Sequence, residues 1–377
     1  FSSGVQNTAL GYNALAAFTT GIQNTILGSY AGQSITSGNY NTFVGSGAGN
    51  SITTGGQNTF VGRNVGTGAD DASFCVAVGD TILNANFGNS NIGMGYNVLV
   101  GVTGTGNIGI GNNVNTAANS RNYTIGIGIN ALRYNNAHYT VAIGFQAGEN
   151  NTGGGENTFL GTSTGFKNEV GTQNTYVGYQ AGAYASASYN TFVGRNAGLG
   201  GASSAPYSSG EYNVAVGTRA LAGFTTGHSN IAVGYQAGDA ITTGDRNTLL
   251  GTNAGSSLNV GYRNVYIGET TGVSDTDGRN NTAVGMNAAY YLNGGDENTL
   301  IGNKAGFKLG DSGGGASDAD GHSSYNVAVG FGAIGGGDDT VANNTANKNL
   351  AVGYKAHGGN TVDSDGTNIT STGNVAV

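Results

Sequence analysis

A five-residue unit recurs along the whole chain: usually Asn, then Thr, Val or Ile, then a variable residue, then an aliphatic residue, then Gly. Its closing glycine falls at positions 11, 28, 45, 62, 79, 95, 111, 128, 144, 161, 178 and 194, so the spacing is 16 or 17 residues. Further copies continue to Asn374-Val375-Ala376-Val377, which makes twenty-one. A βαβ unit needs about 30 residues. The repeat therefore predicts an all-β chain, a parallel β-roll or β-solenoid of about 21 coils.

The residues between two copies predict the rest of each coil. A small residue, often followed by Gly, stands three positions after most closing glycines, as in Ala31-Gly32 and Ala48-Gly49. We expect a second short strand there. Segments such as Thr19-Thr20-Gly21 contain residues that tolerate a positive φ or favour turns, so they are expected to be corners.

The strand of the five-residue unit is uncharged at its second, third and fourth positions, and the fourth is always aliphatic or Met. Side chains alternate between the two faces of a strand, and we expect the second and fourth positions to line the coil interior. The third position then points away from its own coil. A strand that is apolar on both faces is buried on both, so the third-position side chains are predicted to form the interface of a homotrimer: Phe43, Phe60, Phe159, Tyr176, Phe192, Leu249, Tyr266 and Leu300.

Composition excludes several other classes of protein. Gly contributes 72 residues and charged residues only 9%, but 37% of the chain is apolar, which is unlike disordered sequences. The single Pro excludes collagen. A net charge of −8 with 13 Lys and Arg leaves no basic patch for nucleic acid. No apolar run has the roughly 18 residues of a membrane-spanning helix, so no membrane insertion is expected.

Several copies carry a resemblance to known fibres. Asn213-Val214-Ala215-Val216-Gly217 and Asn230-Ile231-Ala232-Val233-Gly234 resemble the strands of trimeric autotransporter adhesin heads of the YadA type, and the segment 174–182 looks like repeat arrays of bacteriophage tail fibres. The resemblance implies a left-handed homotrimeric β-roll outside the cell, on a virion or on a bacterial surface. It also implies a glycan or protein receptor on a host.

Two groups of residues are candidates for binding. The first is a column of aromatic residues that follow the closing glycine and could stack on sugar rings or pack between subunits: Tyr12, Tyr96, Tyr179, Tyr235 and Tyr354. The second is three copies of Asp-x-Asp-Gly, which suit either Ca²⁺ or turns that bond their own backbone: Asp275, Asp277, Asp318, Asp320, Asp363 and Asp365. No other cofactor is expected.

No catalytic motif is recognisable, and we expect no enzymatic activity. The four histidines lack metal-ligand spacing, and we interpret them as scattered surface residues, including His138. Gly45-Ser46-Gly47-Ala48-Gly49 lacks the following helix that a phosphate loop requires. Glu residues are too sparse to predict a pair of glycan-cleaving carboxylates.

Changes in the spacing divide the chain into three predicted regions. Residues 1–200 form a regular array, residues 201–302 an array after an insertion around Pro206, and residues 303–377 coils with long insertions at 303–326, 334–348 and 357–373. Insertions on a rigid scaffold are common recognition sites. The expected function is a structural and adhesive fibre, either a phage tail fibre or the head of a bacterial surface adhesin. Lesser alternatives are a glycan-degrading fibre and ice binding, the latter disfavoured because the Thr column is expected to face inward.

Overall fold

The structure is a computed structural model that describes residues 4–117, 120–201, 203–309, 323–335, 346–356, 371–372 and 375–377. All regular secondary structure in these ranges is β, which confirms the predicted all-β solenoid with a repeat of about 17 residues. The same ranges contain no helix with the length and hydropathy needed to cross a membrane. The chain divides into two compact units, Phe1–Tyr179 and Gln180–Val377, which we call the N-terminal and C-terminal units.

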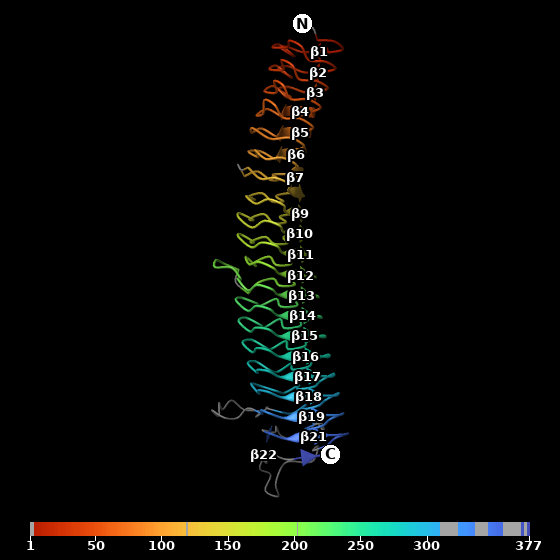
Figure 1. Ribbon diagram of the computed structural model, residues 1–377, viewed down its shortest axis with the longest axis vertical. Helices are drawn as coiled ribbons and strands as arrows, with labels where there is room; N and C mark the ends of the chain where they lie inside the picture. The colour runs from red at the N-terminus through yellow and green to blue at the C-terminus, as the bar shows by residue number, and fades with distance from the viewer. Residues whose placement is uncertain are drawn as a thin grey trace. The chain divides into compact units, whose positions relative to one another are not determined.

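Each copy of the five-residue unit forms one short strand (Figure 1). The strands of the N-terminal unit are β1 (Thr8–Leu10), β2 (Thr25–Leu27), β3 (Thr42–Val44), β4 (Thr59–Val65), β5 (Val76–Ile82), β6 (Ile92–Val98), β7 (Ile108–Asn112), β8 (Ile125–Ile127), β9 (Val141–Ile143), β10 (Thr158–Leu160) and β11 (Thr175–Val177). Those of the C-terminal unit are β12 (Thr191–Val193), β13 (Val214–Val216), β14 (Ile231–Val233), β15 (Thr248–Leu250), β16 (Val265–Ile267), β17 (Thr282–Val284), β18 (Thr299–Ile301), β19 (Val327–Val329), β20 (Ala346–Asn347), β21 (Leu350–Val352), β22 (Ser371–Thr372) and β23 (Val375–Ala376).

Strands of neighbouring coils pair in parallel and in register. Thr42 lies beside Thr59, Phe43 beside Phe60 and Val44 beside Val61. The same register places equivalent residues of the repeat side by side in the C-terminal unit, as between β14 and β15. Each position of the repeat therefore forms a column that runs from coil to coil. The pair β20 and β22 forms a separate small ladder.

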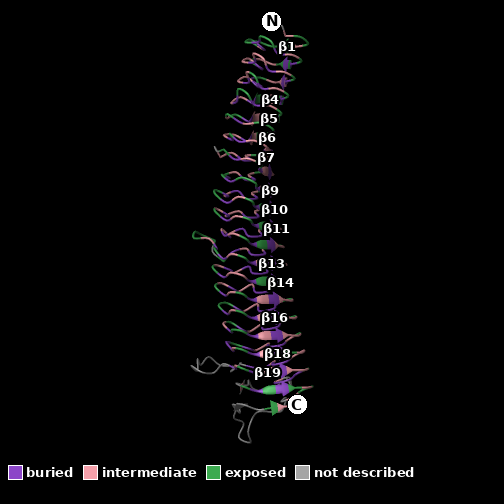
Figure 2. Ribbon diagram, viewed as in Figure 1, coloured by how far each residue is buried: buried purple, intermediate pink, exposed green. Residues whose placement is uncertain are grey.

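The face assignment expected from the sequence is wrong. In β2 and β3 the middle residue of the strand, the third position of the repeat, is fully buried, while the residues on either side are partly or well exposed. Figure 2 shows that the coils carry both buried and exposed residues. All eight residues predicted to form a trimer interface have no exposed surface within the single chain: Phe43, Phe60, Phe159, Tyr176, Phe192, Leu249, Tyr266 and Leu300. They fill the interior of their own coils and are not available to a sister chain.

The reason for this orientation lies in the first and fifth positions, which share a strand face with the third. The fifth position is the closing glycine, which has a positive φ and lies against the backbone of the next coil. At Gly45, a Cβ would lie 2.0 Å from the carbonyl oxygen of Gly62. Only glycine fits such a close approach. The first position is a buried Asn, so the odd positions point inward.

The buried asparagines form a hydrogen-bonded ladder between coils. The Asn41 side-chain amide donates to Asn24 Oδ1 at 3.1 Å and to the Gly55 carbonyl at 2.9 Å, and the Asn41 backbone N–H donates to the same Asn24 oxygen at 3.0 Å. Buried polar groups need such partners. In the N-terminal unit the column is interrupted by Cys75, Thr124 and Thr140.

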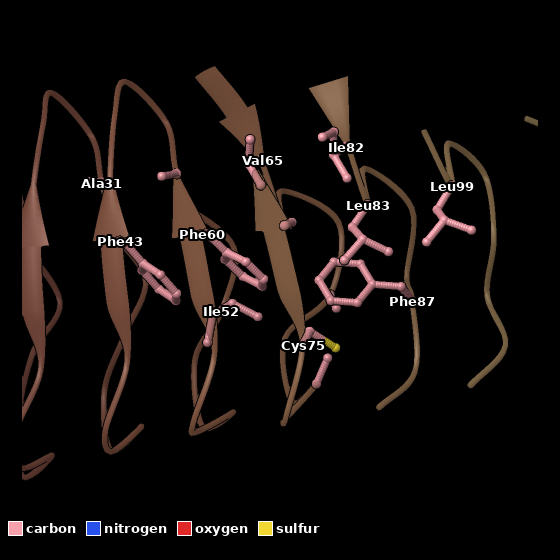
Figure 3. Packing of buried hydrophobic residues seen from close by; sticks show 14 of the residues in the cluster. Ala31, Phe43, Ile52, Phe60, Val65, Cys75, Ile82, Leu83, Phe87 and Leu99 are labelled. Carbon is pink, nitrogen blue, oxygen red and sulfur yellow. The ribbon is translucent and has the colours of Figure 1, made fainter. Parts of the chain in front are cut away.

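The opposite wall of the coil is mostly a series of turns rather than the expected second strand. Only β4, β5 and β6 extend to seven residues and reach it. In other coils the wall is held by backbone bonds such as Gly32 N–H to the Ala48 carbonyl, 2.9 Å. Its small residues leave room for the third-position rings, and the rings of Phe43 and Phe60 stack at 4.9 Å (Figure 3).

Candidate interaction surfaces

The second and fourth positions of the repeat form an uncharged outer face, which we call the apolar outer face although Thr occupies the second position in about half of the strands. The fourth position is aliphatic or Met in every strand of the main ladder, and neither position carries a charge. Large side chains exposed on this face in the N-terminal unit are Leu10, Leu27, Val61, Val76, Met94, Ile143 and Leu160. In the C-terminal unit they are Ile231, Val233, Ile301, Leu350, Val352, Val375 and Val377. The second position contributes a column of Thr, Val and Ile, so the Thr residues expected to face inward lie on the surface.

The aromatic column after the closing glycine is also on the surface. Tyr12, Tyr96, Tyr179, Tyr235 and Tyr354 are between 49% and 74% exposed. Tyr354 stacks on Phe331 with ring centroids 5.4 Å apart. In the N-terminal unit, Tyr12 and Tyr96 are separated by five coils, or about 24 Å at the usual strand spacing. The structure therefore does not bring these residues into one site, and their role in binding stays a prediction.

Asp275, one of the candidate calcium ligands, is buried inside its coil. Its carboxylate accepts a hydrogen bond from the Tyr266 hydroxyl and backbone N–H bonds from Gly278 at 2.9 Å and Gly294 at 3.1 Å. Burial raises the pKa of Asp275 to about 6, and burial beside this carboxylate raises the pKa of Tyr266. Of the two interpretations of the Asp-x-Asp-Gly turn, the structure shows the turn bonded to its own backbone.

Of the remaining candidate metal ligands, only Asp277 lies within the described residues. Asp277 is half-buried and accepts a hydrogen bond from Thr276, while Asp318, Asp320, Asp363 and Asp365 lie outside the described residues. Within the described ranges, no group of three or more His, Cys, Asp or Glu side chains could hold a metal ion. The long insertions predicted as recognition loops also lie largely outside the described residues.

A groove of about 360 Å³ opens at the corner before the strands β9, β10 and β11. Its lining comes from three consecutive coils: Asn136, Ala137, His138, Tyr139, Gly153, Gly155, Glu156, Thr172 and Gln173. Tyr139 is 58% exposed and stacks on Tyr123 of the preceding coil with ring centroids 5.6 Å apart. The groove thus combines an aromatic surface with several polar side chains, which is the usual composition of a small-ligand site.

The polar side chains of this groove are held in place by neighbouring coils. His138 Nδ1 accepts the backbone N–H of Asn122 at 3.0 Å. In the neutral imidazole the proton is then on Nε2, because Nδ1 is the acceptor. Gln173 Nε2 donates to Glu156 Oε2 at 2.8 Å. These contacts fix one donor and one carboxylate acceptor along the groove.

A second groove, of about 250 Å³, lies in the C-terminal unit near Arg219 and Asp239. The Arg219 guanidinium is 3.5 Å from the Asp239 carboxylate, which also accepts a hydrogen bond from Gln236 at 3.0 Å. Partial burial raises the pKa of Asp239. These charged groups already contact each other. This groove therefore offers a ligand fewer available polar groups than the first groove does.

Sequence reasoning missed the groove at His138. A usable signal was the run Gly153-Gly154-Gly155, because Gly155 occupies a position that carries a polar side chain in most other coils, such as Asn122 and Asp245. In a comparison with known proteins, no family model matches the chain, and no curated protein matches it significantly.

Proposed function

We propose that this chain is a segment of a non-catalytic extracellular attachment fibre, such as a bacteriophage tail fibre, that assembles with identical copies through the apolar outer face. The observation that supports this most directly is the uncharged pair of columns on the strands. A monomer rarely exposes a continuous apolar patch above a few hundred Å². In the N-terminal unit alone, eleven strands give a strip about 50 Å long at the usual strand spacing.

A second copy of the chain is the occupant that fits this strip. The two columns repeat at every coil, and equivalent residues lie side by side from strand to strand. A surface with the same coil spacing can match this periodicity along its whole length. An unrelated globular partner does not have this spacing. Closure around a rotation axis covers the strip on every copy and leaves no open end for further association. We propose three copies.

The test is the solution mass of the chain, measured by light scattering after size-exclusion chromatography. We expect three times the chain mass for the wild type. The double variant Leu160→Glu with Val233→Glu adds a charge to the outer face of each unit and is expected to dissociate into monomers. The matched control is Val170→Glu with Val260→Glu, because these residues are exposed at corners away from the strands. A monomeric wild type would rule out the assembly.

Attachment to a host surface is the second part of the proposal. Repeated coils form a stiff scaffold on which exposed corners and insertions can present binding residues. The alternative role, the head of a bacterial surface adhesin, is distinguished by the rest of the gene, where a coiled-coil stalk and membrane anchor indicate an adhesin and a chaperone domain indicates a tail fibre. Binding of the labelled chain to bacterial cells tests attachment itself.

Ice binding is a second candidate function that the structure makes worth testing. The reason for disfavouring it was an inward Thr column, and the structure places that column outside. Thr8, Thr25, Thr42 and Thr59 lie side by side on four consecutive coils. The following five coils have Val or Ile at this position, which interrupts the array. A measurable thermal hysteresis of the purified chain would favour ice binding over the fibre proposal.

A further inference from the structure

We propose that the groove before β9, β10 and β11 binds a neutral saccharide. This inference rests on the attachment part of the proposed function and names the chemical class of its ligand. It does not depend on the outer face of the strands, because the groove lies at the coil corner and is lined by a single chain.

Tyr139 supplies the stacking surface of the site. Its ring is 58% exposed and lies beside the ring of Tyr123 at an interplanar angle of 12°. The neighbouring ring supports one side of Tyr139 and limits its movement. Large rigid aromatic side chains with one exposed side suit contact with an apolar ligand face, and the C–H face of a sugar ring is such a surface.

Hydroxyl groups of a sugar need both acceptors and donors around that stacking surface. The exposed Glu156 carboxylate is an acceptor, and its position is set by the 2.8 Å bond from Gln173. The His138 Nε2–H is a donor that no acceptor in the described part of the chain takes up. The groove therefore offers one of each to a ligand with vicinal hydroxyls.

Gly155 adds a further donor from the backbone. In several other coils, the side chain at this position accepts the backbone N–H of the equivalent residue one coil earlier. Asn122 Oδ1 accepts the Thr105 N–H at 2.7 Å, and Asp245 Oδ1 accepts the His228 N–H at 3.1 Å. Gly155 has no side chain to do this for His138, and within the described ranges the His138 N–H has no acceptor. A ligand oxygen can take the place that a side-chain oxygen occupies elsewhere.

Charge and size narrow the ligand class. The lining contains Glu156 but no Lys or Arg, and the whole chain has a net charge of −8. Anionic sugars and phosphates are therefore poor ligands. A volume of about 360 Å³ falls at the lower end of the usual range for small-ligand sites. A neutral mono- or disaccharide unit of a longer glycan fits these limits.

The experiment uses the full chain and a defined set of probes: maltoheptaose, cellopentaose and N-acetylglucosamine pentamer as neutral oligosaccharides, and a galacturonate pentamer as the anionic one. Saturation-transfer NMR detects weak binding, and titration gives the affinity. We expect at least one neutral probe to bind and the galacturonate probe not to bind. No transfer to any neutral probe at 20-fold excess over the chain would overturn the proposal.

Two variants separate the groove from the rest of the surface. Tyr139→Ala removes the stacking ring and is expected to weaken binding at least tenfold. Gly155→Asn supplies the side chain that Asn122 has at this position and is expected to block the site with the fold preserved, because its Cβ would meet the His138 carbonyl oxygen at 3.1 Å, which needs only a small shift. The matched control is Tyr212→Ala, since Tyr212 also forms an exposed stacked pair, with Tyr189 at 4.8 Å, but lies outside the groove.

The outcomes distinguish this inference from the proposed function. If both groove variants bind the probe like the wild type, the groove is not the saccharide site. If they bind bacterial cells as well as the wild type does, attachment stands and the groove is not its site. If the wild type binds a neutral probe but no bacterial cell, the saccharide inference stands and the attachment role does not.

Discussion

The coil interiors around Phe60 and around Tyr266 are built from the same positions of the repeat, but one interior is apolar and the other contains a buried hydrogen-bonded carboxylate. In the N-terminal unit, Phe60 fills its coil with other apolar groups, including the rings of Phe43 and Phe87 (Figure 3). In the C-terminal unit, Tyr266 stands in the column of Phe60, and its hydroxyl donates to the carboxylate of Asp275. Asp275 stands in a column where the coils on either side carry Leu258 and Leu292.

This comparison shows that the repeat sets the shape of the interior more strictly than its polarity. A buried carboxylate is costly unless its oxygens are hydrogen-bonded. Asp275 meets this condition because one oxygen binds the Tyr266 hydroxyl and the other binds the amides of Gly278 and Gly294. The polar coil therefore depends on a matched set of partners, whereas the apolar coil depends on volume alone.

The largest effect is expected from emptying the apolar coil. Phe60→Ala removes a fully buried ring, and we expect a loss of about 3–5 kcal/mol in the free energy of unfolding. Urea denaturation followed by circular dichroism measures it. Phe74→Ala is the control, because Phe74 is 59% exposed, and it should change the midpoint little. Equal losses in both variants would contradict the interior position of the third-position column.

The polar coil should respond to pH where the apolar coil does not. The folded-state pKa of Asp275 is about 6, above the ordinary 3.8, so the folded chain binds this proton more tightly than the unfolded chain. Stability should therefore rise as the pH falls from 7 to 4, by about 2 kcal/mol from this group. Asp275→Asn should flatten that part of the profile. An unchanged profile in the variant would show that other groups control it.

Converting the polar coil into an apolar one tests the comparison directly. Tyr266→Phe and Asp275→Leu each leave the other residue without its hydrogen-bond partner. Each is expected to lower the free energy of unfolding by about 1–3 kcal/mol. The double variant places a Phe in the third-position column, as at Phe60, and a Leu between Leu258 and Leu292, and it should recover most of that loss. A double-mutant cycle on the free energy of unfolding measures the coupling. Additive losses would mean that the two side chains do not act as a pair.

The smallest effect is expected at the break in the asparagine ladder. Cys75 is fully buried at a ladder position and accepts the Asn91 backbone N–H only through its sulfur, at 3.4 Å. Cys75→Asn supplies an amide to Asn58 Oδ1 and an oxygen to Asn91, so we expect a gain of about 1 kcal/mol. The melting temperature should rise with it. Cys75→Ser, which cannot reach both neighbours, should give no such rise.

Much of the fold follows from the period of the repeat, but the direction of its faces does not. Alternation shows that Thr42 and Val44 share one face and Phe43 lies on the other, without saying which face is inside. The deciding signal was that Asn41 and Gly45, the first and fifth positions, share a face with Phe43. A position that only glycine can occupy belongs where two backbones approach closely, which is inside the coil stack. Apolar character alone was misleading because both faces have it.

The candidate site was predicted less well than the fold, for a physical reason. The aromatic residues after the closing glycine lie on the surface of the single chain, but Tyr12 and Tyr96 are five coils apart. The groove at His138 forms from single residues of three consecutive coils, so no local motif marks it. Its one trace in the sequence is a side chain that Gly155 lacks. Such a gap becomes visible only when the coils are aligned as neighbours.

The asparagine ladder has a consequence for how such a chain can change in length. The Asn41 and Asn58 amides each bond to the equivalent residue one coil earlier and to the backbone carbonyl of the residue 14 positions later. When one whole 17-residue unit is duplicated or deleted, the two coils that become neighbours can therefore form the same hydrogen bonds with each other. Reach can be tuned in steps of one strand spacing, about 4.8 Å, without redesigning any interior.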